Sequence, residues 1–288
     1  MKSLRLPAIT AFVTIVVLAF LSLGGGALHG GEKTLKLFFL DVGQGDATLV
    51  ESPSGTQILI DGGADSRVLS ALGGAMGFFD RDIDMIVATH PDQDHIGGLV
   101  DVLIRYDVKA VLMTENVNDT PVYDAFVRAV KEEGATVYFA RAGQTYDLGK
   151  GVTGSTTLAI LFPDHDPTNL ESNTASIVAQ LSYGANTYML MGDSPTEIEE
   201  YLVSKMGSAI VSDVLKVGHH GSKTSSSETF ITAVQPQYAI ISAGKDNGYG
   251  HPHSEVTNRL TKHNIIQKNT ADLGSIFLES DGSSFWFR

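Results

Sequence analysis

Four side chains of metal-binding types stand close together in the stretch Thr89–Gly98, which reads THPDQDHIGG. His90, Asp92, Asp94 and His95 fall within six positions, on a loop between an apolar run and an expected helix. Neutral histidine supplies nitrogen ligands and aspartate supplies hard oxygen, and a pair of divalent ions is a common means of activating water for hydrolysis. A single aspartate here could be an N-cap, but four such residues together favour a metal site.

More polar groups follow apolar strands later in the chain. Asp193 follows TYMLMG, His219 follows DVLKVG, and residues 242–244 end the run YAIISAG. In a sheet flanked by helices, the ends of such strands gather at one rim. We therefore expect these side chains to converge with His90 on a single site.

The loop GHHGSKTSS contains His219, His220 and Lys223. These groups could donate a proton to a leaving oxygen and contact phosphate. The alternative is a polar loop that caps the helix expected near Ser226. We favour the catalytic interpretation, because two adjacent histidines are an unusual choice for a cap.

Two further stretches are less specific. VGQGD at 42–46 lacks the Gly-Lys-Ser/Thr of a phosphate-binding loop, so we interpret it as a tight strand connection that buttresses the site. His251 and His253 share the loop YGHPH, where one of the two could be a surface residue. His29 and His263 are interpreted as incidental.

Composition limits the function classes. The chain has 288 residues, a formal net charge of −13 and no cysteine, so disulfides, thiolate ligands and a cysteine nucleophile are excluded. The negative charge argues against nucleic-acid binding by bulk electrostatics. The segment Lys205–Lys268 is a local exception, with seven Lys/Arg against four Asp/Glu.

The N-terminus has the pattern of a targeting segment. Lys2 and Arg5 precede an apolar run from Leu6 to Leu23, which is followed by three glycines. This predicts a signal peptide or a membrane anchor over residues 1–30, and places the domain over 31–288 outside the cytoplasmic membrane, secreted or membrane-anchored.

Strand and helix patterns alternate through that domain. Turn residues predict hairpins at Pro53–Gly55, Tyr183–Asn186 and Asp281-Gly282. Helices are expected at 122–133, 197–205, 226–234 and 254–263. The pattern indicates an α/β fold with two mixed sheets and helices outside them.

The metal-binding stretch resembles a family motif. His-x-Asp-x-Asp-His followed by Ile-Gly-Gly is similar to the His-x-His-x-Asp-His motif of the metallo-β-lactamase superfamily. FLDVGQGDA, LIDGG, MGD, DVLKVGHHGSKTSS, AIISAG and YGHPH, in this order, resemble the hydrolase domain of ComEC-type competence proteins from about Leu35 to the C-terminus. The resemblance implies an αββα sandwich with the site on its rim.

The resemblance also implies roles for individual residues. Asp61 would brace the site, and Asp94 would orient or deprotonate the attacking water. The implied metal ligands are His90 and Asp92 for one ion, Asp94 and His95 for the other, Asp193 between them, and His219 or His220 with His251 or His253 to complete the site.

Two departures from the family motif affect the metal. Asp92 replaces a histidine, and the slot of a further motif histidine holds Asn173, with His165 nearby in a different register. One position is therefore poor in nitrogen. We expect one or two divalent ions, with manganese or magnesium as candidates beside zinc.

These observations predict a metal-dependent hydrolase, with a phosphodiesterase or nuclease acting on extracellular DNA as the leading hypothesis. Lys223, Lys245 or a histidine would assist the leaving group. The expected partners are DNA and a membrane DNA-uptake channel protein, because ComEC-type proteins carry such a channel region. The alternatives are hydrolysis of a small ester, lactam or phosphoester, and a non-catalytic DNA-binding or scaffold module with a decayed site.

Overall fold

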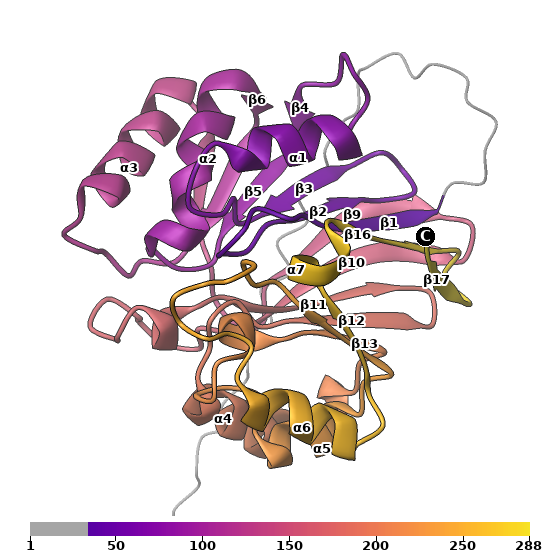
Figure 1. Ribbon diagram of the computed structural model, residues 1–288. Helices are drawn as coiled ribbons and strands as arrows, with labels where there is room; N and C mark the ends of the chain where they lie inside the picture. Colours follow the sequence, from indigo (N-terminus) through magenta and orange to yellow (C-terminus); the bar gives the residue numbers. More distant parts are fainter. Residues whose placement is uncertain (1–33) are drawn as a thin grey trace, which may run out of the picture.

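The computed structural model describes residues 34–288 and contains two large sheets packed face to face. Figure 1 shows helices α1, α2 and α3 covering one outer side of this pair and α4, α5 and α6 covering the other. The predicted targeting segment 1–30 lies outside the described residues. Within residues 34–288, every helix is too short or too polar to cross a membrane.

The first sheet has eight strands, and its outer face packs against three helices. The helices are α1 (Arg67–Ala75), α2 (Gln93–Arg105) and α3 (Pro121–Glu133). The strands in spatial order are β17 (Phe285–Phe287), β16 (Ile276–Ser280), β1 (Leu35–Phe39), β2 (Thr48–Glu51), β3 (Gln57–Ile60), β5 (Met85–Ala88), β7 (Ala110–Met113) and β8 (Thr136–Phe139). Beside them, β4 (Asp82–Ile83) and β6 (Asp107–Val108) form a short parallel pair.

The second sheet has seven strands and carries the later helices. In spatial order the strands are β15 (Ile266–Asn269), β14 (Tyr238–Ile241), β13 (Val214–Lys216), β12 (Asn186–Leu190), β11 (Val178–Tyr183), β10 (Gly154–Phe162) and β9 (Thr145–Gly151). The helices are α4 (Thr196–Met206), α5 (Glu228–Val234), α6 (Ser254–Lys262) and the short α7 (Thr270–Leu273), with 3-10 turns at Asn173–Ala175, Gly207–Ile210 and Gly218–Gly221.

Apolar side chains fill three layers in this arrangement. The layer between the sheets includes Leu37, Ile60 and Leu158, all buried. The outer layers pack the first sheet against α1–α3 and the second sheet against α4–α6. Central strands such as β5, β7 and β13 are buried along their whole length, so each sheet is apolar on both faces and needs a cover on both sides. The predicted αββα sandwich is confirmed.

The three predicted hairpins are also confirmed, since β2 pairs antiparallel with β3, β11 with β12, and β16 with β17. Helix α1 was not predicted. Its sequence RVLSALGGA contains two adjacent glycines, which weaken the local helix signal. Packing of Val68 and Leu72 against the first sheet compensates.

Parallel strands direct several polar loops to the same rim. In the first sheet β3, β5 and β7 run parallel, and in the second β12, β13 and β14 do so. Strand β5 ends two residues before His90, and β13 ends three residues before His219. The loops after these strand ends therefore lie at one rim, and they contain the residues that the sequence predicts for the site.

Candidate metal centre

Asp61 orients two histidines of the site, His95 directly and His90 through Thr89. Its carboxylate accepts hydrogen bonds from the Thr89 backbone N–H at 2.9 Å and the Thr89 hydroxyl at 2.8 Å, and lies 2.8 Å from His95 Nδ1. A carboxylate only accepts, so His95 Nδ1 is the donor. The Thr89 hydroxyl has used its proton and must accept from His90 Nδ1 at 3.0 Å. Both histidines therefore direct Nε2 into the site, the nitrogen that would bind a metal ion.

The glycine pair after His95 allows this close packing. A Cβ atom on Gly98 would lie 2.1 Å from the carbonyl oxygen of Gly62, and one on Gly97 would lie 2.1 Å from that of Ala64. Any larger residue would separate α2 from the loop that follows Asp61. The pair in HIGG is therefore needed to press the bracing carboxylate against the N-terminal turn of α2.

The paired histidines enter the site on a strained turn. His219 and His220 both have positive φ, 49° and 54°, a conformation that costs a non-glycine residue about 1–3 kcal/mol. His220 Nδ1 lies 3.0 Å from the Ser242 carbonyl oxygen, which can only accept, so Nδ1 is the donor. His220 Nε2 then faces Asp94 Oδ2 at 3.2 Å and Asp193 Oδ2 at 3.5 Å.

His219 repeats this arrangement nearer the surface. Its Nδ1 lies 3.0 Å from the Thr224 hydroxyl, and its Nε2 lies 3.9 Å from Asp193 Oδ2. The side chain keeps 24% of its surface exposed, whereas that of His220 keeps 1%. Both histidines of the pair therefore reach the site, but only His219 is open to a substrate.

His251 lies against the two histidines, and His253 lies farther out. The ring centroid of His251 is 5.6 Å from that of His219, and its Nδ1 is buried without a hydrogen-bond partner in the described chain. Burial and the neighbouring histidines lower the pKa of His251 to about 4. His253 Nδ1 instead accepts the backbone N–H of Lys223 at 3.1 Å. His251 is thus the better candidate of the two for a ligand.

The facing atoms form two groups around Asp193. We call His90, Asp92 and Asp193 the first position: His90 Nε2 lies 3.7 Å from Asp92 Oδ2 and 3.9 Å from Asp193 Oδ2. We call Asp94, His95, Asp193 and His220 the second position, where His95 Nε2 lies 3.3 Å from Asp193 Oδ1. His90 Nε2, His95 Nε2 and Asp193 Oδ1 are buried and have no hydrogen-bond partner among the described residues. Such converging unpartnered atoms fit a metal ion.

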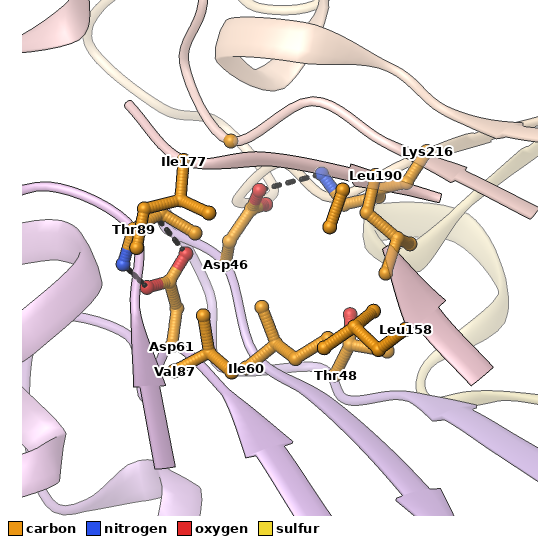
Figure 2. A pocket seen from close by; sticks show the side chains of 12 residues that line it. Asp46, Thr48, Ile60, Asp61, Val87, Thr89, Leu158, Ile177, Leu190 and Lys216 are labelled. Atoms are coloured by element: carbon orange, nitrogen blue, oxygen red, sulfur yellow. Dashed lines mark hydrogen bonds and ion pairs between the residues drawn. The ribbon is translucent and has the colours of Figure 1, made fainter. Parts of the chain in front are cut away.

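Asp46 and Lys216 form a buried ion pair beneath these groups that the sequence did not reveal. Lys216 Nζ donates to Asp46 Oδ2 at 2.7 Å, while Asp46 Oδ1 lies 3.3 Å from His220 Nδ1. Figure 2 shows both side chains beside a cavity between the sheets that also contacts Asp61 and Thr89. This cavity has a volume of about 20 Å³, enough for one water molecule.

Asp46 also belongs to the group of atoms best arranged for an ion. One ligand atom each from Asp46, His95, Asp193 and His220 lies within 4.8 Å of the others. Burial alone would raise the pKa of Asp46, but Lys216 and His220 outweigh it and the pKa is lowered. Asp46 stands in the quoted stretches VGQGD and FLDVGQGDA, and Lys216 stands in the quoted stretch DVLKVGHHGSKTSS. Neither stretch predicts their pairing, because it depends on contact between the two sheets.

Charge at the site also fits divalent ions. Burial would disfavour charged His220, but Asp193 and Asp46 raise its pKa to about 10. Burial, with His95, lowers the pKa of His90 to about 4. Beyond the Asp46–Lys216 pair, the site contains four carboxylates, which two divalent ions would neutralise: Asp61, Asp92, Asp94 and Asp193.

The remaining predicted residues lie at varied distances from the cluster. Asp92 Oδ1 accepts hydrogen bonds from Ser172 Oγ at 2.6 Å and Asn118 Nδ2 at 3.3 Å, which turns the other oxygen toward His90. Lys223 is exposed at the rim and forms no ion pair with a described residue. His165 lies outside the site beside Asp164.

Comparison with known proteins identifies related sequences. Residues 40–245 match the family model described as the Metallo-beta-lactamase superfamily. ComE operon protein 3 of Bacillus subtilis is 32% identical over 82% of this chain and 32% of its own length. Recombination protein 2 of Haemophilus influenzae is 30% identical over 96% of this chain and 32% of its own.

Competence protein ComA of Neisseria gonorrhoeae is 32% identical over 88% of this chain and 33% of its own length. This chain thus spans about a third of the length of these relatives. Their names confirm the resemblance to ComEC-type competence proteins that the motifs indicate.

Solved structures share the fold at low sequence identity. The metallo-beta-lactamase fold protein YhfI from Bacillus subtilis aligns with a TM-score of 0.53 and 13% identity, covering 86% of this chain and 100% of that one. CmlA, a diiron beta-hydroxylase from Streptomyces venezuelae, aligns with a TM-score of 0.50 and 16% identity, over 83% of this chain and 53% of its own. These likenesses concern the fold alone.

Proposed function

Since this chain belongs to the metallo-beta-lactamase superfamily, we propose that it is a metal-dependent nuclease that hydrolyses phosphodiester bonds in extracellular DNA. The observation that carries the proposal is the convergence of buried, unpartnered Nε2 and carboxylate atoms from His90, His95 and Asp193. The competence and recombination proteins among the relatives favour nucleic acid over other substrates.

Each residue of the site receives a role from its surroundings. A divalent ion bound there supplies an activated water and positive charge against phosphate oxygens. Burial acts to raise the pKa of Asp94, but the hydrogen bond with His220 lowers it to about 2, so Asp94 is ionised and able to orient the attacking water. We assign His220 to metal binding because it is buried, and His219 to the leaving oxygen because it is exposed.

A polar groove beside the centre supports a strand-shaped substrate. It has a volume of about 690 Å³, and its lining includes Arg67, Lys245 and Asn247. The Gly244 backbone N–H donates to Gln44 Oε1 at 3.2 Å, and Gln44 stands two residues before Asp46. The groove lining therefore includes the loop that leads to Asp46. Its cations, Lys245 and Arg67, the latter paired with Asp65, could contact phosphates of the strand.

The proposed function also includes a cellular location and a partner protein. We assign the chain to the outside of the cytoplasmic membrane, secreted or held by residues 1–30, on the pattern of that segment. A membrane DNA-uptake channel is the proposed partner, on the similarity to competence proteins. Manganese or magnesium is proposed for the oxygen-rich position, and zinc remains a candidate at the other.

The test compares the full chain with its Asp94→Ala variant on single- and double-stranded DNA, with added manganese, with zinc, or with EDTA. We expect cleavage that requires metal and falls about 10²–10⁴-fold in the variant. Asp124→Ala is the matched control, because Asp124 is an exposed carboxylate on α3. Cleavage that persists in EDTA would contradict the proposal. Intact DNA together with turnover of a small ester, lactam or phosphoester would replace it with the alternative hydrolase.

A further inference from the structure

The first position has fewer donors than the second. Its described donors are one nitrogen, on His90, and carboxylate oxygens of Asp92 and Asp193. His219 Nε2 also lies 3.9 Å from Asp193 Oδ2, but we assign this exposed histidine to the leaving oxygen and do not count it as a ligand. The second position has two nitrogens, on His95 and His220, besides its carboxylates. An ion at the first position therefore needs a further donor from a neighbouring segment or from solvent.

One short segment, residues 172–177, forms hydrogen bonds with or next to all three donor residues of the first position. Ser172 Oγ donates to Asp92 Oδ1 at 2.6 Å, and Ser176 Oγ accepts the backbone N–H of Asp193 at 3.2 Å. The Ile177 backbone N–H donates to the Thr89 carbonyl oxygen at 2.9 Å, next to His90. The 3-10 turn Asn173–Ala175 stands between these contacts.

This turn contains an unexplained polar atom. The side-chain oxygen of Asn173 is buried and has no hydrogen-bond partner among residues 34–288. A buried amide oxygen without a partner is unfavourable unless a water or a cation satisfies it. Amide oxygen is a hard donor of the kind that manganese and magnesium bind.

We propose that Asn173 Oδ1 is a ligand of the ion at the first position and makes that position selective for a hard divalent cation. With Asn173, the donors there are one nitrogen and at least three oxygens, whereas the second position has two nitrogens. The two positions then differ in preference, with manganese favoured at the first and zinc accepted at the second. The inference rests on the proposed metal centre.

The test measures metal binding by the full chain rather than its activity. Manganese is titrated into metal-free protein and followed by the loss of the free-ion electron paramagnetic resonance signal. We expect two ions per wild-type chain. In Asn173→Ala one of them should bind at least about tenfold more weakly, a typical effect of removing a metal-site group.

Two further variants separate ligation from folding. Thr174→Ala changes the next residue of the same turn and should bind as the wild type does, since its backbone contact to Glu171 is retained. Asn173→His adds nitrogen and should raise the zinc-to-manganese ratio at the first position, measured by elemental analysis after equilibrium with both ions. Circular dichroism melting confirms that each variant is folded.

The outcomes are distinguishable. A wild-type chain that binds no metal overturns both the metal centre and this inference. Wild-type binding of two ions that is unchanged in Asn173→Ala leaves the centre intact and overturns the role of Asn173. Loss of one ion in Asn173→Ala but not in Thr174→Ala, with the shift toward zinc in Asn173→His, supports it.

Discussion

The same hydrogen-bonding device recurs at four histidines of the site. Each Nδ1 of His90, His95, His219 and His220 lies within 3.0 Å of an oxygen atom of the protein. Each Nε2 faces Asp193 at 3.3–3.9 Å. The Nδ1 contact and the ring orientation are thus set before any ion arrives, which lowers the reorganisation that metal binding requires.

Asp61 supports two of these histidines, His95 directly and His90 through the Thr89 hydroxyl. A single substitution can therefore test the role of its negative charge. In Asp61→Asn one acceptor oxygen becomes an N–H₂ donor that faces the donors of Thr89 and His95. We expect metal affinity to fall about 10–100-fold with the fold retained. Isothermal titration with manganese measures this, and Asp65→Asn, at an exposed carboxylate farther along the same loop, is the control. Equal affinity in both variants would remove Asp61 from the support of the site.

At this scale the sequence predicted the residue types better than their contacts. His90, Asp94, His95 and Asp193 could be chosen because metal-binding types cluster after apolar strands. The choice of His251 over His253, and the presence of Lys216 under Asp46, depend on contacts between segments far apart in the chain. A single sequence contains no local signal for such contacts.

At the scale of elements, a side chain on α4 forms hydrogen bonds with the end of the loop that contains the paired histidines. Glu199 on α4 is buried, and its carboxylate accepts the backbone N–H groups of Ser226 and of Ser227, the latter at 2.7 Å. Ser227 is the N-cap of α5. Sequence patterns located both helices within about two residues, but the carboxylate that joins them lies outside the local window on which such patterns depend.

The glycines of α1 and α2 should respond oppositely to the same substitution. Gly98→Ala puts a methyl group 2.1 Å from the Gly62 carbonyl oxygen. We expect it to lower the free energy of unfolding by about 1–3 kcal/mol. Gly73 in α1 has no atom within 4 Å of its Cβ position, so Gly73→Ala should raise stability by about 0.5–1 kcal/mol. Urea unfolding measures both; a neutral Gly98→Ala would contradict the close packing of α2 on the Asp61 loop.

At the scale of the whole molecule, net charge and local charge have opposite signs. The chain has a formal charge of −13, yet Lys223 and Lys245 stand exposed beside the metal centre. An acidic surface repels a polyanion such as DNA everywhere except at a basic patch. It therefore favours weak binding at that patch over nonspecific binding to the whole surface. That behaviour suits an enzyme that processes a strand in passing better than a storage or coating protein.

Salt dependence tests whether these two lysines touch phosphate. Each contact with a phosphate of single-stranded DNA releases about 0.7 counterion. A plot of the logarithm of affinity against the logarithm of salt concentration therefore falls with a slope of about 0.7 per contact. In Lys223→Ala or Lys245→Ala we expect KM for single-stranded DNA to rise and the slope to fall by about 0.7. Lys150→Ala, an exposed lysine on β9, should leave both unchanged. If all three variants share the wild-type slope, the strand follows another path across the rim, and the groove lined by Arg67 and Lys245 loses its role in substrate binding.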